Sequence, residues 1–203
     1  MNATPSFKVN PIGLVAAGLL IALAAEREPP WWRLDAGGLA VFNLSPFKAT
    51  LLIAGGDVMP PIVEWLTLGA WLAVLVGAAL MVAGSLSSKP WSKSLVSFGL
   101  SKIAWEVGAL IALGALIFLA TGPSTALLRQ FGHGVEVLEL RTPLLVGEGL
   151  LKLRVAQQVG EVTVTIPIIA SLTDRFYLAV ASLAACLAAR MYQGRLARPA
   201  RAP

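Results

Sequence analysis

Four long apolar segments constrain this chain more than any other feature of its sequence. A helix that crosses a bilayer needs about 20 mostly apolar residues. Segments that approach or reach this length cover residues 9–25, 62–83, 103–121 and 168–191. Overall, 57% of the residues are apolar and 13% are charged, whereas soluble domains average about 25% charged residues. The sequence therefore predicts a membrane α-helical fold, a four-span transmembrane bundle.

The predicted spans divide the chain into eight parts. Their order is an N-terminal tail with the first span (1–25), an outer loop (26–61), the second span (62–83), a cytoplasmic loop (84–102), the third span (103–121), a second outer loop (122–167), the fourth span (168–191) and a basic cytoplasmic tail (192–203). The first span, which follows Lys8 and ends in Ala22-Leu23-Ala24-Ala25, also fits a cleavable signal peptide. We expect it to be retained as a span, and cleavage stays open as the alternative.

The orientation follows from the distribution of Lys and Arg, which accumulate on cytoplasmic flanks. Eight of the 16 basic residues fall in the two tails, in the loop 84–102 and, as Arg190, at the end of the fourth span, with no acidic residue among them. The outer loops mix basic residues with nearly all of the acidic ones. Trp and Tyr at the predicted span ends agree with this assignment, namely Trp65 and Tyr177 outside and Trp91, Trp105 and Tyr192 inside. We expect a multi-pass cell-membrane protein with both termini cytoplasmic. The excess of basic residues is then explained as a signal for membrane topology, and no binding of nucleic acid is expected.

Strand patterns occur in both outer loops. Residues 39–44 and 47–53 predict a β-hairpin in the first loop. In the second loop apolar and polar residues alternate over 151–156 and 161–166, which predicts another hairpin, preceded by a strand over 135–141. Lys152 and Arg154 are expected to face Glu161 across it. Because a lone hairpin is marginal in water, we expect both loops to share one small extracytoplasmic β-sheet of about four or five strands.

This layout resembles that of tetraspan proteins such as claudins, which also have inner termini and a sheet formed from two outer loops. The Trp31-Trp32 pair lies in the corresponding first outer loop. The likeness covers the layout alone, because the paired outer cysteines that define claudins are absent: the one cysteine, Cys186, lies in an apolar run. It implies no activity and no site residue.

The residues that carry catalytic chemistry are scarce. One histidine, His133, and one cysteine, Cys186, fall in different predicted segments, so the sequence predicts no metal site, no cofactor and no catalytic residue. His133 lies between two glycines and is interpreted as a turn residue. Glu106 is expected near the inner end of the third span in an interfacial ion pair with Lys102, which is favoured over a role in ion coupling.

A noncatalytic role is the leading hypothesis. The outer β-domain would mediate contact with a neighbouring copy or with another membrane protein, because free sheet edges offer backbone groups for strand addition. The alternatives are a subunit of an oligomeric channel and an accessory subunit of a larger membrane complex. An enzyme acting on lipids ranks last, because it would need polar groups that converge on a cavity at the membrane surface.

Overall fold

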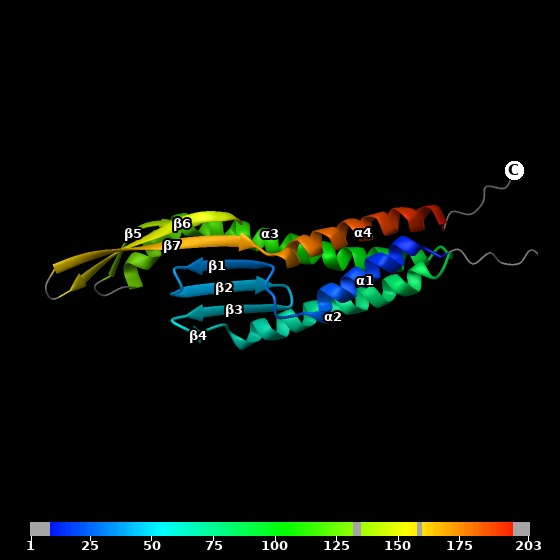
Figure 1. Cartoon of the computed structure of the whole chain (residues 1–203), viewed down its shortest axis with the longest axis horizontal. Coiled ribbons are helices and arrows are strands. Elements are labelled where there is room, and N and C mark those ends of the chain that lie inside the picture. Colours follow the sequence, from blue (N-terminus) through cyan, green and yellow to red (C-terminus); the bar gives the residue numbers. More distant parts are fainter. Residues whose placement is uncertain (1–8, 132–134, 158–159, 197–203) are drawn as a thin grey trace, which may run out of the picture.

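The computed structural model describes residues 9–131, 135–157 and 160–196, and it shows an elongated molecule with most of the helical part at one end and the sheet at the other (Figure 1). The helices of this described part are α1 (Pro11–Ala25), α2 (Pro61–Ser85), α3 (Ser92–Phe131) and α4 (Asp174–Leu196). Its strands are β1 (Trp32–Ala36), β2 (Ala40–Ser45), β3 (Lys48–Ile53), β4 (Gly56–Asp57), β5 (Val135–Arg141), β6 (Gly147–Gln157) and β7 (Gly160–Leu172).

The prediction of a four-span bundle is wrong. Within the described residues, three helices are long and apolar enough to cross a membrane, namely α2, α3 over Ser92–Leu119, and α4. Helix α1 is apolar, but its 15 residues extend only about 22 Å at 1.5 Å per residue. The helix begins after its cap Asn10 and ends before Glu26, so it is shorter than the span predicted over 9–25.

The sheet is also larger than predicted, which makes the fold mixed rather than a helical bundle. Seven antiparallel strands lie in the order β4-β3-β2-β1-β7-β6-β5 within the described part of the chain. Both predicted hairpins and the predicted strand over 135–141 are present. The extra strands are β1 and β4, and β7 continues to Leu172, into the segment predicted as the fourth span. Strand β1 pairs with β2 on one side and β7 on the other, and so joins the strands of the two loops.

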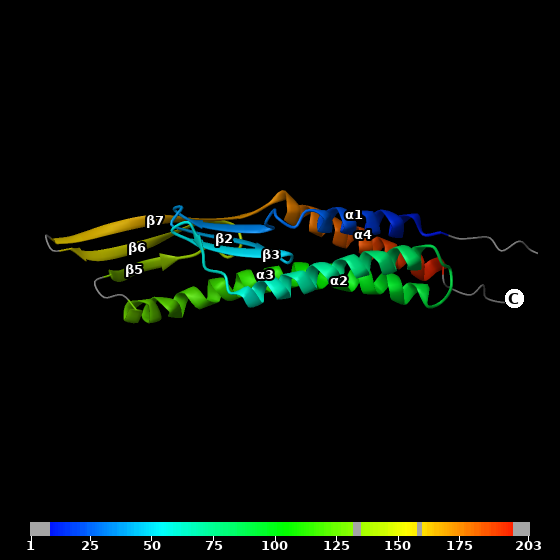
Figure 2. The same cartoon turned by 90° about the horizontal axis from the view of Figure 1, so that it is seen from below.

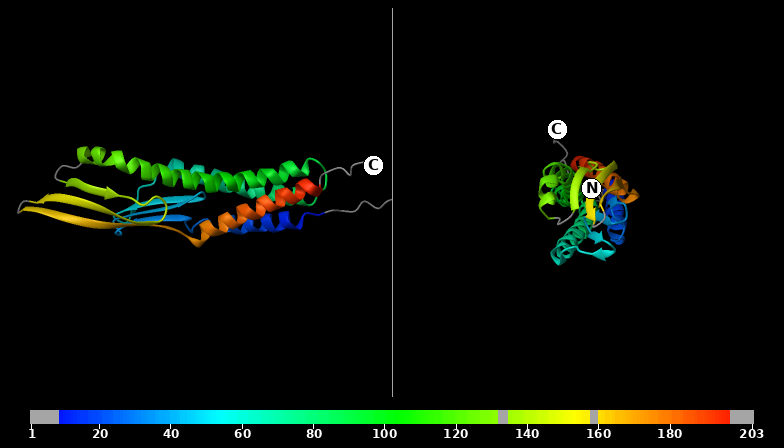
Figure 3. Two further views of the ribbon diagram at one scale, coloured as in Figure 1. Left: turned by 90° about the horizontal axis from the view of Figure 1, so that it is seen from above. Right: turned by 90° about the vertical axis from the view of Figure 1, so that its left-hand side faces the viewer.

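Helix α3 is the longest element and serves both halves of the molecule. Its 40 residues give a length of about 60 Å, twice the hydrocarbon thickness of a bilayer. The first half lies among the other helices, and the second half runs beside the sheet on the side of β5 (Figures 2 and 3). The sequence pattern predicted a helix only over 103–121, where the residues are most apolar.

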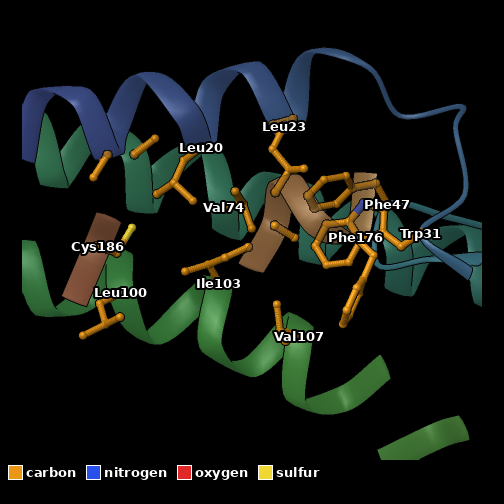
Figure 4. Packing of buried hydrophobic residues seen from close by; sticks show 14 of the residues in the cluster. Leu20, Leu23, Trp31, Phe47, Val74, Leu100, Ile103, Val107, Phe176 and Cys186 are labelled. Carbon is orange, nitrogen blue, oxygen red and sulfur yellow. The ribbon is translucent and has the colours of Figure 1, made fainter. Parts of the chain in front are cut away.

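The sheet begins inside the helix bundle. Trp31 and Phe47 are 1% exposed and pack edge to face, with ring centroids 5.6 Å apart. They belong to the same core as Leu23 of α1, Val74 of α2 and Phe176 of α4 (Figure 4). The aromatic residues that directly precede β1 and β3 therefore complete the hydrophobic core of the helices.

Backbone hydrogen bonds continue the sheet up to the first turn of α4. Trp31 N donates to Leu44 O at 2.9 Å, and Thr173 N donates to Trp31 O at 3.0 Å. The Thr173 hydroxyl donates to Pro30 O at 2.5 Å, and the Thr173 carbonyl accepts from Phe176 N at 3.0 Å as α4 begins. A single residue therefore separates strand β7 from helix α4, which leaves little freedom between sheet and bundle.

A buried polar cluster closes the opposite end of the bundle. Asn10 Oδ1 accepts from Gly13 N at 2.9 Å and caps α1. Its Nδ2 donates to Gln193 Oε1 and to Ala189 O, both at 2.9 Å. Gln193 Nε2 in turn donates to Ser92 Oγ at 2.7 Å. The start of α1, the start of α3 and the end of α4 are thereby joined at one level, which we call the closed end of the bundle.

Replacement of Asn10 by alanine is expected to destabilise the fold by about 2 kcal/mol. The change removes a helix cap worth about 1 kcal/mol and leaves the buried Gln193 oxygen without its donor, at a cost of about 1–3 kcal/mol. Unfolding of the purified protein in detergent would measure the loss. The control is Asn43→Ala on the sheet surface, where a side-chain hydrogen bond to Thr50 is worth little. Equal losses in the two variants would contradict a special role for the cluster.

Candidate functional site

One long strand edge in the sheet lacks a neighbour. Strand β7 pairs with β6 along its whole length, whereas β1 covers its other edge only from Ile168 to Leu172. No other described strand pairs with residues 161–167 on that side. We call residues 161–167 the open β7 segment. At about 3.3 Å per residue it is about 23 Å long, and Figure 1 shows the β6–β7 ribbon extending beyond the end of β1.

Strand β1 stops pairing with β7 at the turn that follows β1. Gly37 and Gly38 have φ values of +58° and +74°, a conformation that glycine adopts without strain. They reverse the chain beside the sheet, and a Cβ atom on Gly37 would lie 2.9 Å from Ile166 Cγ2. Strand β1 therefore turns back at the point where the open β7 segment begins, and the close approach requires a residue without a side chain.

Pro167 shows which backbone groups of the open segment are unpaired. Pro167 lies opposite Leu150 of β6, and proline is tolerated in a sheet where its nitrogen faces away from a paired strand. Its nitrogen therefore faces the open side. Because the direction of the N–H groups alternates along a strand, the N–H groups of Thr163 and Thr165 face the same side. They are the donors that an added strand would use.

The two outermost strands are better protected than the open β7 segment. Strand β4 has two residues and ends in Asp57. Strand β5 carries Glu139 and Arg141 and has a register shift between Val137 and Glu139. Short length, charge and bulges are the usual means of protecting sheet edges from further pairing. The open β7 segment has no charged residue between Glu161 and Pro167, and Val162 and Val164 are 44% and 40% exposed.

Charged pairs hold the polar face of the ribbon beside this edge. Arg154 Nε lies 3.5 Å from Glu161 Oε2, as the strand pattern predicted. Lys152 instead donates to Glu139 Oε2 at 2.8 Å, so the expected pairing of Lys152 with Glu161 is wrong. Arg141 also contacts Glu139, at 2.8 Å. The hydrogen bond from Lys152 is the main cause of a Glu139 pKa below the ordinary 4.5.

The residues singled out in the sequence do not come together as a reaction centre. His133 lies outside the described residues. Cys186 is buried between helices, with Met81 Sδ 3.9 Å from its thiol. No group of three or more His, Cys, Asp or Glu residues in the described ranges is placed to hold a metal ion. The candidate site is therefore a backbone edge.

Glu106 is placed differently from the prediction. It lies 14 residues after the start of α3, about 21 Å along the helix, and not close to the inner end. It borders a small cavity of about 100 Å³ with Leu44 and Pro46 of the sheet. The expected ion pair with Lys102 is not formed: Lys102 Nζ lies 4.6 Å from the centre of the Phe98 ring. Glu106 thus borders the contact between α3 and the turn that joins β2 to β3.

Sequence patterns alone missed the feature that creates the open edge. The alternation of apolar residues predicted the β6–β7 hairpin, but not which strand would lie beside it. Strand β1, Trp32–Ala36, follows the paired prolines and was not among the predicted strands. The Gly37-Gly38 pair is the local signal that could have indicated a strand before the turn as well as after it.

No protein-family model matches the chain, and comparison with curated proteins gives no significant match. The interpretation of the site therefore depends on the geometry of the chain itself.

The Glu139 carboxyl is expected to titrate below pH 4.5, because Lys152 stabilises its charged form. A lowered pKa in the folded state means that the pair stabilises the β5–β6 ladder at neutral pH, and that this contribution is lost as the pH falls through the folded-state pKa. Carboxyl NMR titration would measure it. Lys152→Met should raise the Glu139 pKa, whereas Arg154→Met, which removes the partner of Glu161, should leave it unchanged. The same pKa in all three proteins would contradict the Lys152–Glu139 contact.

Proposed function

We propose that this chain is a noncatalytic membrane protein that joins to a second copy of itself by strand addition at the open β7 segment. The observation that carries the proposal is a free strand edge about 23 Å long, whose one charged residue is Glu161 at its end, in a sheet whose outermost strands are short or charged. Strand addition uses main-chain hydrogen bonds for affinity and side chains on alternate positions for specificity.

Membrane insertion is supported by the three apolar helices of spanning length. Large apolar side chains stay exposed along them, and lipid tails would cover these: Leu66, Leu72 and Val76 on α2, Ile111 and Leu116 on α3, and Val180 and Leu187 on α4. Basic residues gather at the closed end. Lys89 precedes α3, Lys93 lies in its first turn, and Arg190 and Arg195 lie in the last two turns of α4. Because Lys and Arg accumulate on the cytoplasmic side, the proposal assigns the closed end to the cytoplasm and the sheet to the opposite side.

A second copy is the partner that fits the edge best. Two antiparallel β7 strands related by a two-fold axis at Thr163 would set Thr163 against Thr163 and Val162 against Val164. Such a pairing sets Val162 against Val164 on one face and Thr163 against Thr163 on the other, where Glu161 lies opposite Thr165. The apolar pair and the threonine pair are both favourable. It is isologous, so each copy offers the same surface and the pair is closed.

The direction of β7 determines how two such copies would be oriented. Strand β7 runs along the long axis of the molecule toward the bundle (Figures 1 and 2). Antiparallel pairing would therefore point the two bundles in opposite directions. Copies in one membrane have parallel long axes, so the pair would form between copies in two facing membranes.

The proposed orientation can be measured by cysteine labelling in sealed vesicles. Lys93→Cys and Thr163→Cys, each in a Cys186→Ser background, are expected to react with a membrane-impermeant maleimide from opposite sides. The background substitution removes the native thiol, which is buried. Permeabilised vesicles should label at both positions and serve as the control for accessibility. Labelling of both variants from the same side would overturn the orientation.

The proposed pair can be trapped as a disulfide. Thr163→Cys, in the Cys186→Ser background, should form a cross-linked dimer on mild oxidation. The Thr163 N–H faces the partner strand, so the two copies of residue 163 form a hydrogen-bonded antiparallel pair, whose Cα atoms are about 5.5 Å apart and within disulfide range. The matched control is Ile169→Cys, which is exposed on the same strand but whose edge is covered by β1. No dimer at any position from 162 to 165, or equal dimer at 169, would contradict the contact.

A backbone variant separates strand addition from contact through side chains. Thr163→Pro removes a donor that faces the open side and leaves the β6–β7 ladder in place, so association should be lost, whereas Thr163→Val should keep it.

Mixing two vesicle populations with differently tagged Thr163→Cys copies would show whether the pair forms between facing membranes or within one membrane. Cross-links between the tags support facing membranes, and cross-links confined to one population would refute that arrangement.

A further inference from the structure

A polar cleft lies where the sheet meets the bundle, away from the open β7 segment. It has a volume of about 350 Å³ and is bordered by the segment after α1, by β3 and by the first two turns of α2. A second hollow of about 260 Å³ adjoins it and shares Glu28, Lys48 and Thr50 with it. The floor includes Phe47, which belongs to the buried core. The cleft is therefore backed by the buried core of the fold.

Arg27 contributes a cation that lacks a carboxylate partner. Its guanidinium lies over the Trp71 ring, 5.0 Å from the ring centre, and its Nη2 donates to Phe47 O at 3.3 Å. Its Nε is buried without a hydrogen-bond acceptor, and no ion pair of Arg27 occurs among the described residues. A guanidinium has five N–H donors, so an oxyanion in the cleft would satisfy a charge that the protein leaves unpaired.

The rest of the lining favours a ligand that also carries a positive charge. Lys48 Nζ is 2.5 Å from Glu28 Oε2, so these two charges compensate each other at the rim. Asp57 and Glu64 also line the cleft, and neither forms an ion pair with a described residue, although Asp57 Oδ1 accepts a hydrogen bond from Met59 N at 3.0 Å. One unpaired cation and two unpaired carboxylates in a single cleft fit a ligand that joins an anion to a primary ammonium group.

The surroundings of the cleft indicate where such a ligand would come from. On α2, beside the cleft, Trp65 and Leu66 are 70% and 66% exposed. Exposed tryptophan next to exposed aliphatic residues is typical of the level at which lipid headgroups meet the acyl chains. A polar cleft at this level, open beside an apolar helix surface, can take the headgroup of a lipid while the chains lie along α2.

We propose that this cleft binds the headgroup of an aminophospholipid, with the phosphate at Arg27 and the ammonium group at Glu64 and Asp57. Phosphatidylethanolamine has both groups, and its ammonium can donate hydrogen bonds to carboxylates. Phosphatidylcholine has a methylated ammonium that cannot donate, and phosphatidylglycerol has no cation. The site therefore distinguishes three common headgroups by their chemistry.

Native mass spectrometry of the delipidated full-length protein, with these three lipids added separately, tests the proposal. One bound phosphatidylethanolamine is expected to survive detergent removal, in preference to the other two. Arg27→Gln should weaken this binding about tenfold or more, because it removes a charge-assisted interaction. Arg141→Gln, an exposed arginine on β5 outside the cleft, is the control and should bind as the native chain does. Glu64→Gln should reduce the preference over phosphatidylglycerol.

Two further experiments identify the source of the ligand and test whether the variants are folded. Soluble phosphoethanolamine, added as a competitor, should displace the lipid only at large excess, since it lacks the chains that lie on α2. Binding of the soluble compound without binding of the lipid would overturn the proposal, as would equal adducts of all three lipids. If Arg27→Gln unfolds, Arg27→Lys should restore folding and part of the binding. A folded Arg27→Gln protein that keeps native binding contradicts the site.

Discussion

Burial of Trp31 and Phe47 among the helices is the interaction on which the rest of this structure depends. Two aromatic side chains from the sheet fill the same core as residues of α1, α2 and α4, and burying each large aromatic contributes on the order of 2–3 kcal/mol. The hydrogen bonds of Thr173 to both Pro30 and Trp31 then tie β1 to the start of α4. The sheet is consequently fixed to the bundle, and β6 and β7 extend from it beyond the end of β1.

The same junction explains why α1 is short. Paired prolines at positions 29 and 30 prevent the helix from continuing, and the sheet occupies the space next to α2 and α4 that further turns of α1 would fill. Trp71 Nε1 donates to Ala24 O at 2.8 Å and satisfies a carbonyl at the end of the helix. Hydropathy depends only on local composition, so it cannot show that strands of the sheet take the place of further turns of α1. The apolar segment 9–25 was therefore interpreted as a full span.

Local patterns predicted the parts of the fold that depend on local order. Alternation gave the β6–β7 hairpin, including the contact of Arg154 with Glu161, and length with apolar character gave α2 and α3. Contacts between segments far apart in the sequence could not be predicted from these patterns. The open β7 segment exists because β1, more than a hundred residues earlier in the chain, ends opposite Ile168. Likewise, Arg27 becomes an unpaired charge in a cleft only when β3 and α2 pack around it.

An unprotected strand edge is normally a hazard, because it invites uncontrolled pairing. In the proposed arrangement the membrane removes much of that hazard. Anchored copies in one bilayer keep parallel long axes, so two open β7 segments cannot meet in the antiparallel direction that a closed two-fold pair requires. The edge could then stay free of charges between Glu161 and Pro167 without joining neighbours in its own membrane, and it would remain available to a copy that arrives from the opposite direction. Such selectivity would come from orientation alone, with no need for a specific side-chain code.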